Sequence, residues 1–325
     1  MLFALAVAAC GGAARHAGPA GHIEAGASFA QGGPDQLAFD GVGNLYGVDC
    51  QDSWIFRIDR HGQLWIVGGT GGQGFSGNGG PGAQADFTCP SGIAVDALGN
   101  VYVSDQDNRV RLIDPRGIVH AFAGAGPVPP LDSGAGSFGG DGGPARRARF
   151  RAPAALVFDA AGTLYLSDTG NGAVRRIDRD RIVATVARLS APAGIAFDRG
   201  GALFVALPAA NRVLRVDADG SSTTFARLPH PTALAFDAHG DLYVAEPEEH
   251  QVRRIDRRGA VTVVAGTGRA GFAGDAGPAT RAELDRPDAL VFDRNGNLYV
   301  GDQGNGAIRR IDRKGVITTF FDGRG

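Results

Sequence analysis

The hydrophobic pattern of the chain repeats six times, each time as an apolar run, an aspartate, a glycine and a second apolar run ending in an aromatic residue. The copies begin at Leu37, Ile93, Leu156, Ile195, Leu234 and Leu290. Each copy predicts two β-strands joined by a tight turn, because aspartate supplies local hydrogen bonds and glycine tolerates a positive φ. Segments such as 174–178 and 261–264 follow as third and fourth strands. No segment shows the long 3.6-residue period of a helix.

The spacing of the copies predicts the architecture. The turn aspartates Asp40, Asp96, Asp159, Asp198, Asp237 and Asp293 are 56, 63, 39, 39 and 56 residues apart, so the basic unit has 39 residues and three copies carry insertions. Repeated units of four strands are typical of propeller blades, which cannot bury both faces alone. We therefore expect an all-β fold, a six-bladed β-propeller of four-stranded antiparallel blades. It spans 34–325, with blades near 34–89, 90–152, 153–191, 192–230, 231–286 and 287–325.

Two recurring strings carry a family resemblance. Leu-Tyr-Val-x-Asp occurs at 298–302 and Arg-Arg-Ile-Asp at 309–312, with similar strings in the other copies. The chain resembles the NHL-repeat family from about residue 33 to 325. The resemblance implies recognition of protein, peptide or glycan, although the fold hosts unrelated activities. Similar six-bladed lactonases and lyases place a divalent metal over the central channel, with Glu, Asp, Asn or His ligands. The regular repeats of this chain argue against such catalysis.

One end of the ring, here called the top face, is expected to carry the loops between second and third strands and the connections between blades. The three insertions follow blades one, two and five, so we expect them on this face. Each has a Gly-rich turn containing Asn78, Asp141 or Asp275. We expect these side chains to cap their own turns, with Ca²⁺ binding as the alternative. The ring closes either by packing of blade six on blade one or through an extra strand from residues 22–30.

The second strand ends in an acidic residue in five of the six blades. These residues are Asp49, Asp105, Asp168, Glu246 and Asp302, and Leu207 interrupts the series in blade four. Such a ring is a candidate for binding a cation or a basic ligand on the top face. The structural alternative is that each carboxylate accepts backbone N–H bonds in its own loop or pairs with a repeat arginine. Recurrence from blade to blade favours the structural role.

Blade five departs from the repeat and adds candidate chemistry. We expect His230, which precedes Pro231, to lie near Glu246 and His250 on the top face. The three are candidates for a metal site or an acid–base site, and solvated histidines are the alternative. The sequence has no catalytic triad and no cofactor motif. We therefore predict no catalytic residue and no resident cofactor, with Ca²⁺ or Zn²⁺ as the alternative.

The N-terminus predicts export. Residues 1–10 are apolar and end in Val-Ala-Ala-Cys10, which resembles a bacterial lipobox, although the run is short and no basic residue precedes it. The resemblance implies a signal peptide, cleavage before Cys10 and lipidation of its thiol. Residues 11–33 are rich in Gly and Ala and predict a linker. Cys50 and Cys89 both fall at the top edge of blades one and two, as a disulfide or as two free thiols.

Charge limits the partners. The chain has 32 basic and 34 acidic side chains and a net charge of −2, which gives no electrostatic reason to expect nucleic acid or an anionic membrane. Membrane contact is expected only through the lipid anchor, and the chain is expected to be a monomer. Together these features predict a non-catalytic binding scaffold of the cell envelope, either periplasmic or at the cell surface. It would recognise protein, peptide or glycan through the top face. The alternative is a metal-dependent propeller enzyme, a lactonase-type hydrolase or a lyase.

Overall fold

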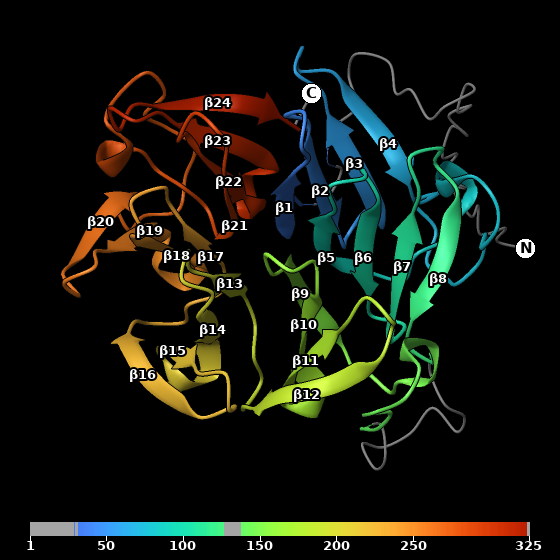
Figure 1. The fold of residues 1–325 in the computed structure, drawn as a ribbon. Helices are drawn as coiled ribbons and strands as arrows, with labels where there is room; N and C mark the ends of the chain where they lie inside the picture. The colour runs from blue at the N-terminus through green and yellow to red at the C-terminus, as the bar shows by residue number, and fades with distance from the viewer. Residues whose placement is uncertain (1–28, 30–31, 127–137, 324–325) are drawn as a thin grey trace, which may run out of the picture.

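Six four-stranded antiparallel sheets stand around a central axis, as predicted (Figure 1). The computed structural model describes residue 29 and residues 32–126 and 138–323. The signal-peptide segment, Cys10 and most of the linker lie outside the described residues. Among the described residues, no helix is both long and apolar enough to span a membrane. The six-bladed β-propeller predicted from the sequence is thus confirmed.

Every blade is formed by four strands that follow one another in the chain, the first strand being innermost. Blades one to three are β1 (Gln36–Phe39), β2 (Leu45–Asp49), β3 (Trp54–Ile58) and β4 (Leu64–Gly68); β5 (Pro90–Val95), β6 (Val101–Asp105), β7 (Arg109–Ile113) and β8 (Val119–Ala123); and β9 (Pro153–Phe158), β10 (Leu164–Asp168), β11 (Ala173–Ile177) and β12 (Val183–Arg188). Blades four to six are β13 (Ile195–Phe197), β14 (Leu203–Leu207), β15 (Arg212–Val216) and β16 (Ser222–Arg227); β17 (Leu234–Phe236), β18 (Leu242–Glu246), β19 (Gln251–Ile255) and β20 (Val261–Ala265); and β21 (Pro287–Phe292), β22 (Leu298–Asp302), β23 (Ala307–Ile311) and β24 (Ile317–Asp322).

Helical structure is limited to single 3₁₀ turns in two kinds of connection. Four follow second strands on the top face: η3 (Thr169–Asn171), η4 (Pro208–Ala210), η5 (Pro247–Glu249) and η7 (Gln303–Asn305). Three lie in the insertions: η1 (Gly82–Gln84), η2 (Ala145–Arg147) and η6 (Ala279–Arg281). Each of these three begins directly after a proline, as expected from the fixed φ of that residue.

The turn aspartates hold the hairpins of the opposite face. Asp96 Oδ1 accepts the backbone N–H groups of Leu98 and Asn100, both at 2.9 Å, and Gly99 between them has a φ of +82°. The repeat aspartate therefore satisfies backbone donors that the tight turn leaves unpaired, which is the role its sequence position predicts.

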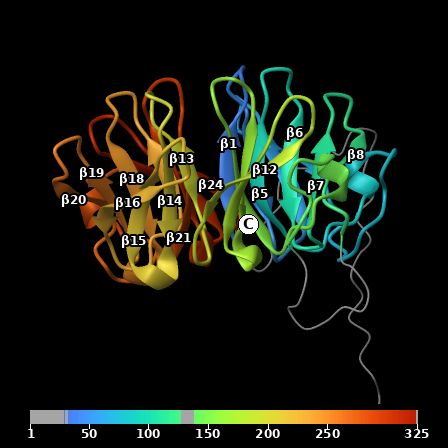
Figure 2. The same cartoon turned by 60° about the horizontal axis from the view of Figure 1, so that its bottom comes forward.

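The apolar core lies between the blades. The cluster between blades two and three, for example, joins Leu112 and Phe122 to Leu156 and Ile177. Figure 2 shows the sheets standing side by side with their strands running roughly along the ring axis. Burial therefore depends on neighbouring blades, as the repeat pattern requires.

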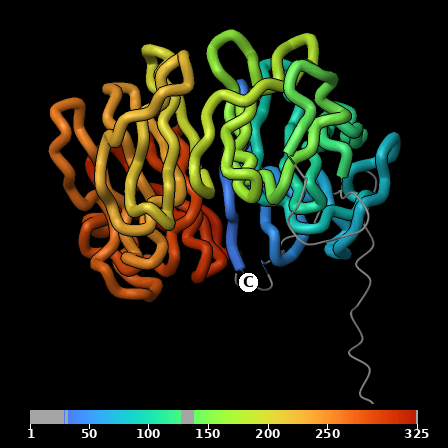
Figure 3. Tube along the Cα trace, turned by 90° about the horizontal axis from the view of Figure 1, so that it is seen from below, coloured from blue at the N-terminus to red at the C-terminus, as the bar shows by residue number. Residues whose placement is uncertain are grey.

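Blade six closes the ring against blade one. The red sixth blade stands beside the blue first blade in Figures 1 and 3, and β21 packs on β1. The Phe29 ring lies 5.1 Å from the Phe56 ring and 5.6 Å from the Phe321 ring, so it joins the two blades. Within the described residues the sixth sheet has four strands and gains no fifth. The alternative, an extra strand from residues 22–30, falls outside the described residues except for Phe29 and stays a prediction.

The three insertions form straps, defined here as residues 74–87, 138–150 and 271–284. The expectation that they stay on the top face is wrong. Each strap descends along the outer strand of the next blade; Gly80 O, for example, accepts the Val119 N–H at 2.9 Å. At the far end, the Gly82 N–H reaches Gly117 O at 2.7 Å, in the turn on the opposite face. The apolar faces of diverging blades explain this path, because the strap fills the space between them.

A buried arginine fixes each strap. Arg175 is fully buried, lies 2.6 Å from the Asp141 carboxylate and has its guanidinium carbon 4.4 Å from the centre of the Phe138 ring. The equivalent contacts are those of Arg111 with Asn78 and Phe75, and of Arg309 with Asp275 and Phe272. Asn78, Asp141 and Asp275 therefore bind an arginine of the next blade, which neither the turn-cap nor the Ca²⁺ expectation included.

A disulfide adds one covalent tie at the top of blades one and two. The structure joins Cys50, in the loop after β2, to Cys89, directly before β5. The bridge spans a sequence separation of 39 residues.

Replacement of both cysteines by serine tests the contribution of this crosslink. We expect the free energy of unfolding to fall by about 2–4 kcal/mol, because the unfolded chain regains the entropy of an open loop. Urea unfolding monitored by circular dichroism measures the change. A reductant should lower the stability of the wild type and leave the variant unchanged; equal stability of the two oxidised proteins would contradict the prediction.

The Asp141→Ala variant tests the strap. It removes the carboxylate that contacts the Arg175 guanidinium and the Thr185 hydroxyl at 2.6 and 2.7 Å. We expect a loss of about 1–3 kcal/mol of unfolding free energy, because a buried cation loses a partner, and faster proteolysis within residues 138–150. Asp180→Ala, at an exposed position, is the matched control. Equal stability and cleavage rates in the two variants would show that the contact is dispensable.

Candidate functional site

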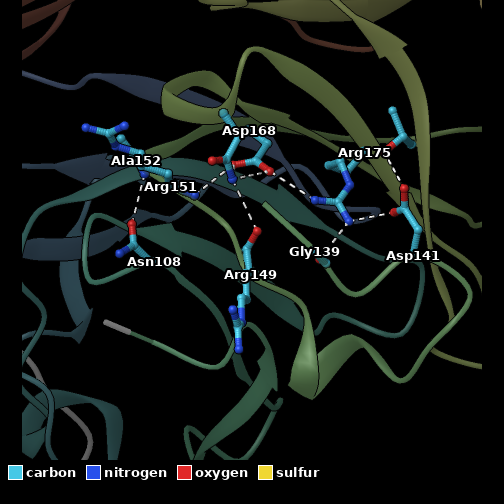
Figure 4. Close-up of polar contacts among 10 residues, drawn as sticks. Asn108, Gly139, Asp141, Arg149, Arg151, Ala152, Asp168 and Arg175 are labelled. Carbon is cyan, nitrogen blue, oxygen red and sulfur yellow. Dashed lines mark hydrogen bonds and ion pairs between the residues drawn. The ribbon is translucent and has the colours of Figure 1, made fainter. Parts of the chain in front are cut away.

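The acidic ring predicted from the sequence is buried beneath the top loops. Asp49, Asp105, Asp168, Glu246 and Asp302 are all 0% exposed. Asp168 accepts the Arg151 N–H at 2.7 Å and contacts the Arg175 guanidinium at 3.1 Å (Figure 4). It also accepts a hydrogen bond from the Asn171 amide at 2.9 Å. Burial raises the pKa of Asp168, while these three donors oppose the increase. Its carboxylate therefore joins the strap arginine to the loop above it.

The other ring aspartates have similar partners. Asp302 accepts the Asp285 N–H at 2.7 Å and contacts Arg309, and burial raises its pKa to about 6. Asp105 accepts the Thr88 and Cys89 N–H groups at 3.0 and 2.9 Å. These contacts supply the structural role weighed for the ring. Binding of a ligand by these buried carboxylates stays a prediction.

Asp49 has no arginine partner of this kind. Phe56 occupies the third-strand position in blade one that Arg175 and Arg309 occupy in blades three and six. Asp49 Oδ1 accepts two loop N–H groups, while its Oδ2 is buried without a hydrogen-bond partner. Burial raises the pKa of Asp49 to about 7, and the nearby charges of Asp52 and Asp35 add to the increase. At neutral pH this carboxyl is therefore only partly ionised.

The blade-five residues do not form one cluster. Glu246 lies 3.0 Å from Arg253 Nε, and burial raises its pKa to about 7. His250 Nδ1 instead accepts the backbone N–H of Arg286, the residue before the proline that opens blade six, at 3.3 Å. Asn108 and Asn211 occupy the equivalent position, and each accepts the corresponding N–H of the next blade. His230 is exposed, and its backbone N–H donates to Asn211 Oδ1 at 3.0 Å. Among the described residues, no three His, Cys, Asp or Glu side chains gather as a metal-binding group.

A pair of carboxylates at the top of the channel was missed from the sequence. Asp35 and Asp288 each follow the proline that opens an innermost segment, in blades one and six. Ser91, Ala154, Ala193 and Thr232 hold this position in the other blades. Asp288 lies close enough to Asp35 and Thr232, its counterparts in both flanking blades, for these to shift its pKa. The effects of Thr232 and of the Asp35 charge on this pKa indicate that the side chain lies toward the inner ends of both neighbouring blades.

The electrostatics of this pair are unusual. Burial raises the pKa of Asp288 to about 7, and the charge of Asp35 raises it further, against the opposing effects of Thr232 and Arg286. Burial also raises the pKa of Asp35, which accepts the Cys50 N–H at 2.7 Å and the Gln303 amide at 2.8 Å. Two neighbouring desolvated carboxyls favour a cation beside them. We call Asp35 and Asp288 the channel-mouth pair.

One signal in the sequence marked these positions. Each blade opens with proline, and only Pro34 and Pro287 are followed by an acidic residue. The acidic ring lies at strand ends and the departures of blades four and five lie in the top loops, whereas this signal lies at strand beginnings. A cavity of about 660 Å³ opens on the opposite face instead, among the turns of blades six, one and two.

Comparisons with known proteins agree with the architecture. A family model described as NHL repeat matches residues 87–109, and one described as SMP-30/Gluconolactonase/LRE-like region matches residues 152–245. A sequence search of curated proteins finds no match.

Three solved structures illustrate the structural similarity. A virginiamycin B lyase from Staphylococcus aureus is 17% identical, with a TM-score of 0.57, over 90% of this chain and 86% of that chain. A gluconolactonase from Xanthomonas campestris is 16% identical, with a TM-score of 0.61, over 94% and 99%. An auxiliary nutrient binding protein from Bacteroides thetaiotaomicron is 16% identical, with a TM-score of 0.64, over 90% and 70%. At such identities the similarity shows the fold alone.

The repeat match, the recurring strings and the six four-stranded blades lead to one assignment. These findings support an NHL-repeat propeller family, with six blades.

Proposed function

We propose that this propeller is a non-catalytic binding scaffold of the cell envelope that recognises a protein, peptide or glycan through its top face. The observation that carries the proposal is the channel-mouth pair, in which burial raises the pKa of both Asp35 and Asp288. A lysine or arginine side chain entering the channel would neutralise this pair. Among the ligand classes, a protein or peptide with an exposed basic side chain fits this charge best.

The disulfide and the lipobox-like N-terminus support the location. A Cys50–Cys89 bridge persists in oxidising compartments, such as the periplasm or the cell surface. We propose that Cys10 carries a lipid and that this anchor is the only membrane contact of a monomeric propeller.

A metal-dependent lactonase or lyase is the second candidate. It is favoured by the gluconolactonase-like match over 152–245 together with the channel-mouth pair, since carboxylates are ligands for divalent metals. Against it, the described residues place no third His, Cys, Asp or Glu side chain beside the pair in a metal-binding group.

The Asp288→Asn variant tests the binding proposal. The probe is a set of short lysine-containing peptides, each with a matched peptide in which norleucine replaces lysine. We expect the wild type to bind the lysine peptides and the variant to lose about tenfold or more in affinity, because a buried charge contact disappears. Asp180→Asn, at an exposed position, is the control. Equal binding of both peptide sets would contradict the proposal, and stoichiometric Ca²⁺ or Zn²⁺ with lactonase activity lost in Asp288→Asn would favour the enzyme.

The pH dependence gives a second test. Since the pKa of Asp288 is raised to about 7, peptide affinity should increase with pH up to about 7, by up to about tenfold per unit, and then level off. Stability should change in the opposite direction. The folded state retains this proton longer than the unfolded chain, so the stabilisation is complete below about pH 4 and is lost as pH rises through about 7. In Asp288→Asn both slopes should be smaller, as calorimetry at several pH values would show.

A further inference from the structure

Blade five retains a binding site for a strap but has no strap. The straps cover the outer strands β8, β12 and β24 of blades two, three and six. Blades four and five receive none, because β12 leads to β13 and β16 leads to β17 through short connections. We call the equivalent surface of blade five the vacant strap site, and define it by Glu246, Arg253, Val261 and Val263.

The arginine of this site is present but uncovered. Arg253 occupies the β19 position that Arg175 and Arg309 occupy in their blades. Its side chain is 28% exposed, whereas those of Arg175 and Arg309 are 0% and 1% exposed. Like them it contacts the carboxylate at the end of the preceding strand, here Glu246. It lacks the strap carboxylate and the aromatic ring that complete the other two sites.

The outer strand of blade five keeps an apolar face. Val261 pairs with Ile255 in the register in which Val183 pairs with Ile177. Val261 and Val263 are 43% and 37% exposed, whereas Val183 is 0% exposed beneath its strap. Val119 and Ile317, the counterparts in blades two and six, are also 0% exposed.

The facing blade supplies a second apolar wall. Phe225 of β16 packs edge-on against Phe204 at 4.9 Å, within the contact between blades four and five. It is 38% exposed, whereas Phe122, which packs in the same manner on Tyr102 next to the second strap, is 7% exposed. Phe225, Val261 and Val263 are three of the six large apolar side chains exposed in the described residues. Half of this exposed set thus lies on the outer strands of blades four and five, β16 and β20.

Blade four shows what an outer face looks like when no strap is present. There Leu207 replaces the acid, Leu214 replaces the arginine, and Ser222 replaces the apolar residue at the Val261 position. The acid, the arginine and the apolar face have therefore been lost together. Blade five has kept all three, which indicates that its site is covered by something other than a strap of its own chain.

We propose that the vacant strap site binds an extended segment of a partner protein with the chemistry of a strap. All three straps share the pattern Phe-x-Gly-(Asp or Asn)-x-Gly-Pro, as at 272–278. The partner backbone pairs with Val261, its carboxylate faces Arg253, and its aromatic ring stacks on the guanidinium beside Phe225. In blades three and six, the hydroxyls of Thr185 and Thr319 also bind the strap aspartate. Blade two has Ala121 at this position opposite Arg111, so the hydroxyl is not required for a strap to bind. This surface is separate from the channel mouth and goes beyond the proposed function.

A synthetic peptide with the sequence of residues 271–284 serves as the probe. Fluorescein-labelled, it is titrated with the complete protein and followed by anisotropy. Binding should be lost, by about tenfold or more, in Arg253→Leu, since the charged contact and the stacking both disappear. Val261→Ser introduces the residue that blade four carries at this position and should also weaken binding, because Val183 and Ile317 are buried there beneath their straps. Arg254→Leu, which changes the adjacent arginine beside Asp241, is the matched control and should bind as the wild type does.

Changes in the peptide give an independent check. Alanine in place of Phe272 or Asp275 in the peptide should weaken binding, and hydrogen exchange at Val261 should slow when the unchanged peptide binds. No binding up to about 1 mM, a range that includes weak transient contacts, would overturn the proposal. Equal binding to Arg253→Leu would also overturn it. A dimer of the chain that Arg253→Leu dissolves would assign the site to a second copy and overturn the partner proposal. Asp288→Asn should leave peptide binding unchanged, which separates this site from the proposed function.

Discussion

Radial sheets diverge toward the rim of the ring, and this constraint governs the rest of the structure. Near the axis the first strands of neighbouring blades pack directly, as β1 does on β21. Toward the rim the apolar faces separate, and exposed apolar area is unfavourable in water. The chain meets this constraint in several ways: with a strap in three contacts between blades, with Phe29 between blades six and one, and with polar Ser222 on the outer strand of blade four.

The buried arginines follow from the same constraint. A strap brings backbone carbonyls and a carboxylate into a closed space, and the guanidinium supplies donors for all of them: Arg175 contacts Asp168, Asp141 and the Gly139 carbonyl. A buried charge is tolerated only with such partners. In blades two, three and six, carboxylate, arginine and strap therefore act as one unit, and blade four lacks all three. The acidic ring looked like a ligand site in the sequence because this structural unit recurs.

The channel mouth differs from these units because its charges are not balanced within the blade. Asp35 and Asp288 come from neighbouring blades, and burial raises the pKa of both carboxyls. Stability alone would favour neutral side chains, such as Ala154 and Ala193 at the same position in blades three and four. A group that weakens the fold where it stands is a candidate for function. The vacant strap site is a different kind of candidate, defined by missing coverage rather than by surplus charge.

The sequence by itself determined the fold, because strand period, turn aspartates and repeat spacing are local properties that the six copies repeat. It placed the ends of the second strands, and hence Asp49, Asp168 and Glu246, at the same level of the ring. The tertiary structure alone decided that these carboxylates are buried, since the cover comes from straps and loops distant in the chain. It also brought Asp35 to Asp288 across the ring closure, from opposite ends of the propeller. The exposure of Arg253 beside Val261 likewise depends on a strap that blade four does not send, which only the packing of neighbouring blades reveals.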